Sequence, residues 1–168
     1  MTVKEKLGNL SDFDLAGRHV DWLPMEWYET RKRILHKRTL SGKEVTLRFL
    51  SESPEITQRD ILFEDMSQVI AVDIVACDCI IVKPVTIFET ASLCYEIGNK
   101  HLPLFFENNC LLVPFEAPLF RLLTAQGYPV LRENRRLLQP LKTTVSPHGD
   151  QGTTSLFSKI MQLAGPSV

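Results

Sequence analysis

The spacing of apolar residues along the chain changes at Pro84, and this change constrains the fold more than any other feature. Before Pro84, short apolar runs bounded by turn residues predict β-strands, and no stretch has the spacing of a long helix. After Pro84, helical and extended patterns alternate. We therefore expect an α+β protein with a β-rich domain over residues 1–77, a second domain over residues 78–145 and a flexible tail over residues 146–168.

The first domain is predicted from one hairpin and two further strands. The run 44–50 alternates apolar and polar residues, so one face of this strand is apolar and the other is exposed to solvent. Ser41-Gly42 supplies a turn residue that tolerates positive φ, and the run 31–40 provides the partner strand. Residues 60–64 and 69–75 have the composition of two more short strands.

The second domain follows the order β-α-β-β-α-β, which predicts a ferredoxin-like unit. Thr86 and Glu89 predict a reciprocal capping box at the start of its first helix, and Gly98-Asn99 predicts a left-handed stop at the end. Gly127 is expected to end the second helix. The apolar face predicted for the first helix consists of Ile87, Ala91, Cys94, Tyr95 and Gly98.

Net charge and hydropathy argue against a protein that binds nucleic acid or membranes. A formal net charge of −1 over 168 residues provides no basic field for nucleic acid or an acidic membrane surface. No apolar run has the length of a membrane-spanning helix, and the N-terminus lacks the apolar core of a signal peptide. We expect a cytoplasmic protein that binds neither nucleic acid nor membrane.

Two of the four histidines are candidate metal ligands. His101 follows the predicted helix stop and precedes an apolar strand, so rigid elements hold it at the surface. His148 lies in a Pro-His-Gly-Asp segment that offers no packing reason for an imidazole. One imidazole does not hold a transition metal well, so two copies of His101 would have to face each other across a two-fold axis. His148, Asp150 or water would complete the coordination sphere.

The cysteines are weaker candidates. Cys77 and Cys79 share one face of a strand, where both thiols could bind one soft metal ion. Zinc knuckles, however, need two or more residues between the cysteines and a second pair of ligands elsewhere. We interpret them as small apolar strand residues, and Cys94 and Cys110 as core residues. The basic run 31–38 is expected to be a solvated hairpin face or a docking surface for an acidic partner.

Several segments resemble the UreE family of urease accessory proteins, which are nickel metallochaperones. The resemblance is carried by Trp22-Leu23, Glu26-Trp27, the run 30–34, Asp60-Ile61-Leu62 and above all Gly98-Asn99-Lys100-His101. It implies a homodimer formed through the ferredoxin-like domain, with Ni²⁺ bridged by paired His101 side chains. It also implies delivery of nickel to an accessory GTPase and then to urease apoprotein, and a first domain similar to a peptide-binding chaperone module.

The chain departs from some members of this family. It lacks a histidine-rich tail, and Val113–Ala117 replaces the extra histidines that some members carry after the signature. We therefore expect one bridging site per dimer, with zinc as a possible competing ion. The alternative is a metal-independent module that binds polypeptide partners. An enzyme is disfavoured because no set of nucleophile, base and orienting residue stands out.

Overall fold

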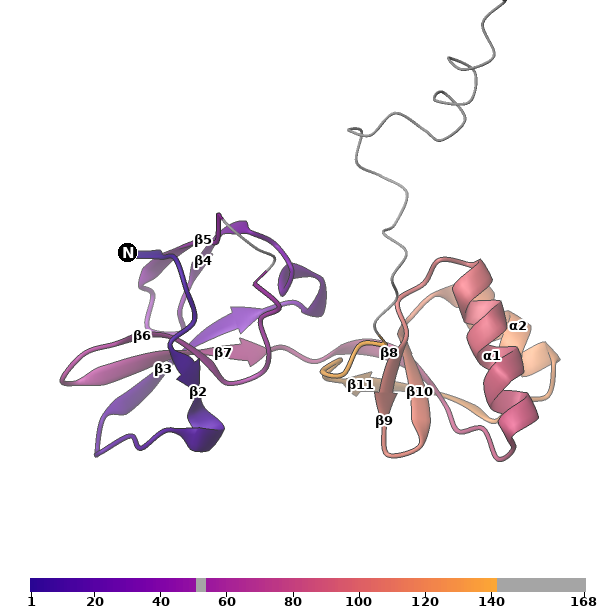
Figure 1. Ribbon diagram of the computed structural model, residues 1–168. Coiled ribbons are helices and arrows are strands. Elements are labelled where there is room, and N and C mark those ends of the chain that lie inside the picture. Colours follow the sequence, from indigo (N-terminus) through magenta and orange to yellow (C-terminus); the bar gives the residue numbers. More distant parts are fainter. Residues whose placement is uncertain (51–53, 142–168) are drawn as a thin grey trace, which may run out of the picture.

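The computed structural model describes residues 1–50 and 54–141. The expected tail over residues 146–168, and His148 with it, lie outside the described residues. Figure 1 shows a strand-rich N-terminal half and a C-terminal half that carries both α-helices. The chain passes from one half to the other between Ile74 and Cys77.

Two sheets form the N-terminal half. The three-stranded sheet contains, in spatial order, β1 (Thr2–Val3), β5 (Glu44–Arg48) and β4 (Ile34–Arg38). The four-stranded sheet contains β2 (Gly8–Asn9), β6 (Asp60–Glu64), β7 (Gln68–Ile74) and β3 (His19–Met25). Short 3₁₀ turns occur at η1 (Leu10–Asp12) and η2 (Trp27–Glu29). A shared core joins the sheets, since Val45 and Leu47 cluster with Leu23, Ile70 and Val72.

The predicted hairpin is present as β4 and β5. Its strands pair antiparallel, and Gly42 in the turn has a φ of +89°, a conformation that glycine adopts without steric penalty. Val45 and Leu47 are buried, whereas Glu44 and Arg48 are exposed, as the alternation predicted. The strands expected at 60–64 and 69–75 are also confirmed, as β6 and β7.

Two buried carboxylates tie loops to this half of the molecule. Asp60 accepts hydrogen bonds from the Thr57 amide at 2.7 Å and from Asn9 Nδ2 at 3.0 Å, and it pairs with Lys6 Nζ at 3.0 Å. Asp21 accepts hydrogen bonds from both the amide and the hydroxyl of Ser41 at the hairpin turn. Because buried carboxylates are stable only when they are hydrogen-bonded, these contacts fix the positions of the loops.

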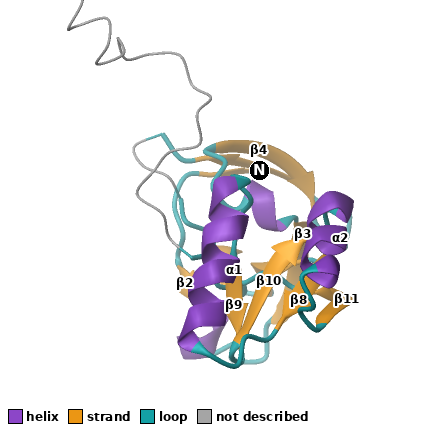
Figure 2. Cartoon of the chain, turned by 90° about the vertical axis from the view of Figure 1, so that its right-hand side faces the viewer, coloured by secondary structure: helices purple, strands orange, loops and turns teal. Residues whose placement is uncertain are grey.

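The C-terminal half has the element order predicted from the sequence. Its elements are β8 (Cys77–Val82), α1 (Ile87–Asn99), β9 (Phe105–Glu107), β10 (Cys110–Pro114), α2 (Ala117–Ala125) and β11 (Val130–Arg135). The sheet order is β11-β8-β10-β9 and every pairing is antiparallel. Both helices lie over one face of this sheet (Figure 2), with Ile80, Leu93, Ile97, Leu119 and Leu123 in the core between them.

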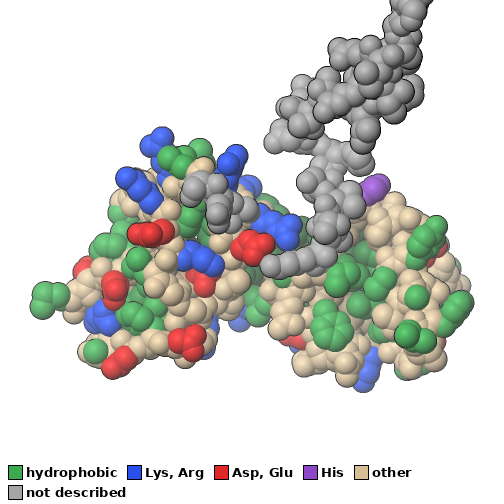
Figure 3. Space-filling model, in the orientation of Figure 1, with side chains coloured by type: hydrophobic (Ala, Val, Ile, Leu, Met, Phe, Trp, Pro, Cys, Tyr) green, Lys and Arg blue, Asp and Glu red, His purple; other side chains and the backbone are tan. Residues whose placement is uncertain are grey.

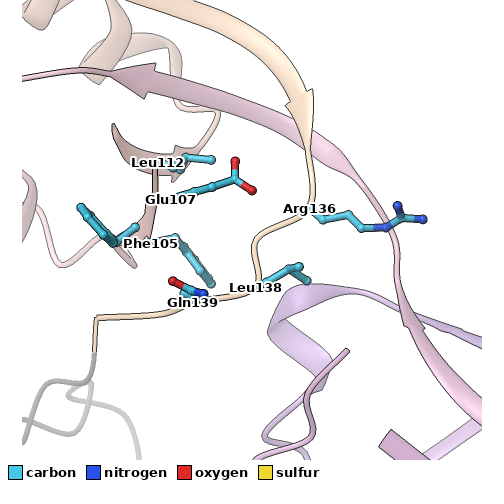
Figure 4. A pocket seen from close by; sticks show the side chains of 7 residues that line it. Phe105, Glu107, Leu112, Arg136, Leu138 and Gln139 are labelled. Atoms are coloured by element: carbon cyan, nitrogen blue, oxygen red, sulfur yellow. The ribbon is translucent and has the colours of Figure 1, made fainter. Parts of the chain in front are cut away.

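The opposite face of this sheet meets the N-terminal half. The ring of Trp27 in η2 stands edge-on to Phe105 with 5.6 Å between ring centroids, and Trp27 packs against the buried clusters of both halves. Arg136 Nε donates a hydrogen bond to the Ile74 carbonyl at 2.8 Å. A hollow of about 50 Å³ adjoins this contact, and the Arg136 side chain points away from it (Figure 4). The hollow is far smaller than the few hundred Å³ of typical small-molecule sites.

The apolar face predicted for α1 is wrong. Leu93 and Ile97 are fully buried and Cys94 is half-buried, whereas Ile87 is 90% exposed and Tyr95 is 70% exposed. The helix carries two apolar faces, and spacing alone does not say which one meets the sheet. The sheet takes the face that includes Leu93 and Ile97, and the other face remains at the surface.

Candidate metal site

Helix α1 places His101 just beyond its C-terminal end. The helix begins after Thr86, whose hydroxyl accepts a hydrogen bond from the Glu89 amide at 3.1 Å. The capping box is only half formed, because the Glu89 carboxylate accepts a hydrogen bond from Val85 N–H at 2.7 Å instead of from Thr86 N–H. The helix ends at Asn99, so its predicted end is confirmed, but the left-handed conformation predicted for Gly98-Asn99 is wrong.

His101 itself takes the left-handed conformation that terminates α1. Its φ is +54°, its amide donates to the Gly98 carbonyl at 2.9 Å, and the Leu102 amide donates to the Ile97 carbonyl at 3.4 Å. These two bonds form a Schellman motif, in which the left-handed position is usually occupied by glycine. Leu102 is partly buried against the core cluster that contains Ile97, and such an apolar contact commonly accompanies this motif.

Helix α2 ends in the same motif and shows what is unusual about α1. Gly127, with a φ of +83°, donates to the Thr124 carbonyl, and the Tyr128 amide donates to the Leu123 carbonyl. Gly127 is therefore the counterpart of His101, and its predicted role as a helix stop is confirmed. A residue with a Cβ atom in this conformation costs about 1–2 kcal/mol, so His101 occupies its position despite a conformational penalty.

The His101 side chain is exposed, and its ring has no hydrogen-bond partner within the described ranges. In the same part of the chain, no group of three or more His, Cys, Asp or Glu side chains is arranged to hold a metal ion. At the end of α1, one copy of residues 1–50 and 54–141 thus offers a single imidazole, that of His101, without further side-chain ligands arranged around it. A divalent transition metal needs further donors from another source.

An exposed apolar stripe on α1 leads to this histidine. Phe88 is 77% exposed and Tyr95 is 70% exposed, and the small residues Ala91 and Gly98 are exposed between and beyond them. Positions 88, 91, 95 and 98 share one side of a helix. A Cβ atom added at Gly98 would meet nothing within 4 Å in its own chain. The C-terminal half also shows many apolar and few charged side chains in Figure 3.

Comparison with known proteins places the chain in a family. Residues 3–75 match the family described as UreE urease accessory protein, N-terminal domain. The urease accessory protein UreE of Flavobacterium johnsoniae is 44% identical over 164 residues, covering 98% of this chain and 99% of the relative. The chain belongs to the UreE family. The UreE of Actinobacillus pleuropneumoniae is 37% identical over 83% of this chain and 77% of its own length. For Helicobacter pylori UreE the identity is 34%, over 89% of this chain and 91% of the relative.

Membership of the UreE family makes this chain an accessory protein rather than an enzyme. The family match over residues 3–75 ends before β8, so it does not include His101. The alignment with the Flavobacterium relative spans nearly the whole chain and therefore does include it. Within the described ranges, no helix is long and apolar enough to cross a membrane.

The cysteines of this UreE-family chain lie mostly in packed surroundings. Cys77 Sγ and Cys79 Sγ are 3.7 Å apart on one face of β8, and Cys79 is fully buried. Burial, together with the neighbouring Cys77 thiol, raises the pKa of Cys79 to about 12. Both thiols are therefore protonated at neutral pH in the metal-free chain, and no third His, Cys, Asp or Glu side chain of the described ranges joins them in a group that could hold a metal ion. Cys94 and Cys110 are half-buried rather than fully in the core.

The other two histidines of the described ranges lie in the N-terminal half. His36 is exposed on β4, with Nδ1 2.9 Å from Thr46 Oγ1, and His19 is exposed at the start of β3. Sequence reasoning missed the left-handed backbone of His101 and the exposed stripe on α1. The stripe could have been found from the repeat of apolar and small residues at positions 88, 91, 95 and 98.

Proposed function

We propose that this protein is a nickel-binding metallochaperone that carries Ni²⁺ for assembly of the urease active site in the cytoplasm. The observation that carries the proposal is the exposed imidazole of His101, fixed by a Schellman motif at the end of an apolar helix face. A residue retained in an unfavourable backbone conformation suggests a functional reason for its identity. The family membership supports a role in urease maturation.

The site is completed by a second copy of the chain. The stripe on α1 places Ala91 and Gly98 where another helix could approach closely, and Phe88 and Tyr95 supply apolar surface to bury. Two α1 helices related by a two-fold axis that runs along them would pack parallel through this stripe, which would bring their C-terminal ends, and both His101 rings, towards each other. We therefore propose a homodimer in which Ni²⁺ is bridged by the two imidazoles.

His148 supplies further donors, with water or Asp150 filling the rest of the sphere. An open site of this kind binds moderately and releases its ion readily, as a carrier must. Imidazole also suits zinc, so zinc competes for the same nitrogens. The carrier then passes nickel to a urease accessory GTPase and to the urease apoprotein complex, and it binds neither nucleic acid nor membrane.

The domain assignment follows the same proposal. Residues 1–77 form the β-rich domain and residues 78–145 form the metal-binding and dimerisation domain. Antiparallel strands in the order β11-β8-β10-β9, with two helices on one face, support a ferredoxin-like class for the second domain.

Equilibrium dialysis with Ni²⁺, combined with light scattering, tests the proposal. The wild type should bind one tight nickel ion per two chains, and His101→Ala should lose this ion but remain dimeric. Gly98→Gln should fold normally, because a side chain at this position meets nothing in its own chain, yet it should weaken both dimerisation and nickel binding. His148→Ala should weaken binding less than His101→Ala does.

Nickel binding that is unchanged in His101→Ala would overturn the carrier role. The alternative function, a metal-independent module for polypeptide partners, would then be favoured by the exposed apolar residues Ile34 and Leu40 of the N-terminal half. A wild-type protein that stays monomeric with nickel bound would overturn the bridging site.

A further inference from the structure

A second apolar feature of the C-terminal half lies beside α1, next to the exposed stripe. It is a groove of about 570 Å³ between α1 and the β9–β10 hairpin, a volume within the range of ligand sites. Its walls include Val85, Thr90, Cys94, Leu104, Phe106 and Leu141. Val85 is 79% exposed and Phe106 is 47% exposed, so the groove presents apolar surface that nothing in the described ranges covers.

The described chain ends in the wall of this groove. The Leu141 amide donates a hydrogen bond to the Leu104 carbonyl at 2.7 Å, and the Leu141 side chain is 55% exposed. Pro140 also forms an isolated bridge with Phe105. Residues 142–168 therefore begin at the groove itself, which gives any apolar segment among them a high effective concentration there, on the order of millimolar.

One segment of those residues has the pattern of a groove-binding helix. Leu156, Ile160 and Leu163 follow the spacing i, i+4, i+7, which is the anchor spacing of amphipathic helices that bind in apolar grooves. The residues between Leu141 and Leu156 span up to about 50 Å when extended, ample for a return to the groove. The alignment with the Flavobacterium relative covers 164 residues and so includes this segment.

We propose that residues 155–163 occupy the groove between α1 and the β9–β10 hairpin of their own chain, with Leu156, Ile160 and Leu163 as anchors. The groove side of α1 carries Thr90 and Cys94, whereas the stripe assigned to the dimer carries Phe88 and Tyr95. The two surfaces have no residue in common, although they adjoin along α1, because Cys94 lies three positions after Ala91 and four before Gly98.

Docking has a consequence that rests on the proposed function. Residues 142–154 become a loop held at both ends beside α1, and His148 lies near its middle. From Cys94 to Asn99, where α1 ends, is only about 8 Å along the helix axis. A docked segment therefore keeps His148 within reach of His101 and raises its effective concentration at the metal site.

The half-buried thiol of Cys94 is a native reporter, because it lines the groove. Alkylation by N-ethylmaleimide is measured on the metal-free full chain, with peptide mass spectrometry separating Cys94 from Cys110, which is also half-buried but does not line the groove. A segment docked for about nine-tenths of the time slows the reaction of Cys94 about tenfold relative to the double variant Leu156→Ser/Ile160→Ser. Val85→Asp, at the exposed rim, should remove the same protection. Met161→Ser removes a similar apolar side chain from another side of the segment and should leave protection intact.

Equal Cys94 rates in the wild type and the double variant overturn the proposal, and so does loss of protection in Met161→Ser to the same degree. Cross-linking of Ile160→Cys to Cys94 in a mixture of ¹⁵N-labelled and unlabelled protein checks which chain supplies the segment. Cross-links within one isotopic class support docking in the same chain, and mixed cross-links overturn it. Since these measurements need no nickel, their outcome is independent of whether the protein carries the metal.

Discussion

Replacing His101 by glycine and by alanine separates its backbone role from its chemical role. Both variants lose the imidazole, so both should lose the bridging nickel ion. They differ in the left-handed conformation at φ +54°, which glycine adopts freely and alanine does not. Their stabilities should therefore differ although their nickel binding is equally impaired.

The expected difference can be worked out from the backbone. The Cβ atom of alanine costs about 1–2 kcal/mol in this conformation, and the greater freedom of glycine in the unfolded chain offsets about 0.4–1 kcal/mol. His101→Gly should thus be more stable than His101→Ala by about 1 kcal/mol. For a chain of this size, that difference corresponds to about 2–4 °C in Tm.

Neighbouring Lys100 is the matched control. Its φ is −86°, so glycine gains nothing there, and Lys100→Ala should be more stable than Lys100→Gly by about 0.5–1 kcal/mol. Urea unfolding of the four variants checks whether the sign reverses between adjacent positions. Equal stabilities of His101→Gly and His101→Ala would refute the assignment of His101 to the left-handed position of the motif.

Three further changes test the fold. The pKa of Asp21 is lowered because hydrogen bonds from Ser41 and Thr39 outweigh the effect of burial, which raises it. The stability that this carboxylate contributes is therefore present above its ordinary pKa of about 3.9 and is lost as pH falls through its lower folded-state value. Asp21→Asn should cost about 1–3 kcal/mol at pH 7 and less at pH 3, as measured by urea unfolding at both pH values. Leu93→Ala should cost about 2–5 kcal/mol in the same assay because Leu93 is fully buried, and a smaller loss would mean that the core collapses into the cavity. Thr86→Ala should cost about 1 kcal/mol by removing the cap of α1, whereas Thr86→Ser should cost little.

Local chemistry explains which parts of the fold could be predicted from the sequence. Gly42 and Gly127 mark the turn and the helix end because few other residues adopt their backbone conformations readily. The alternation in β5 predicted its buried face correctly, because this strand has one apolar and one polar side.

The errors concern properties that depend on tertiary contacts. The position of the sheet decides which apolar face of α1 is buried. The buried face is the one that contains Leu93 and Ile97. The left-handed residue is His101 rather than Gly98, and Leu102, which follows it, donates its amide to the Ile97 carbonyl and packs against the core cluster that contains Ile97. His101 is predicted as a candidate ligand from its place between a helix and a strand and from the family signature, but a second copy of the chain cannot be derived from the sequence of one.

The ring of Trp27 links the stability of the two halves. It contributes to the packing around buried clusters on both sides of the boundary and meets Phe105 edge to face. Unfolding of either half would expose part of the Trp27 side chain to water and so lower the free energy of unfolding of the other half. The halves should consequently denature together rather than in succession, and the tryptophan emission should report that single transition.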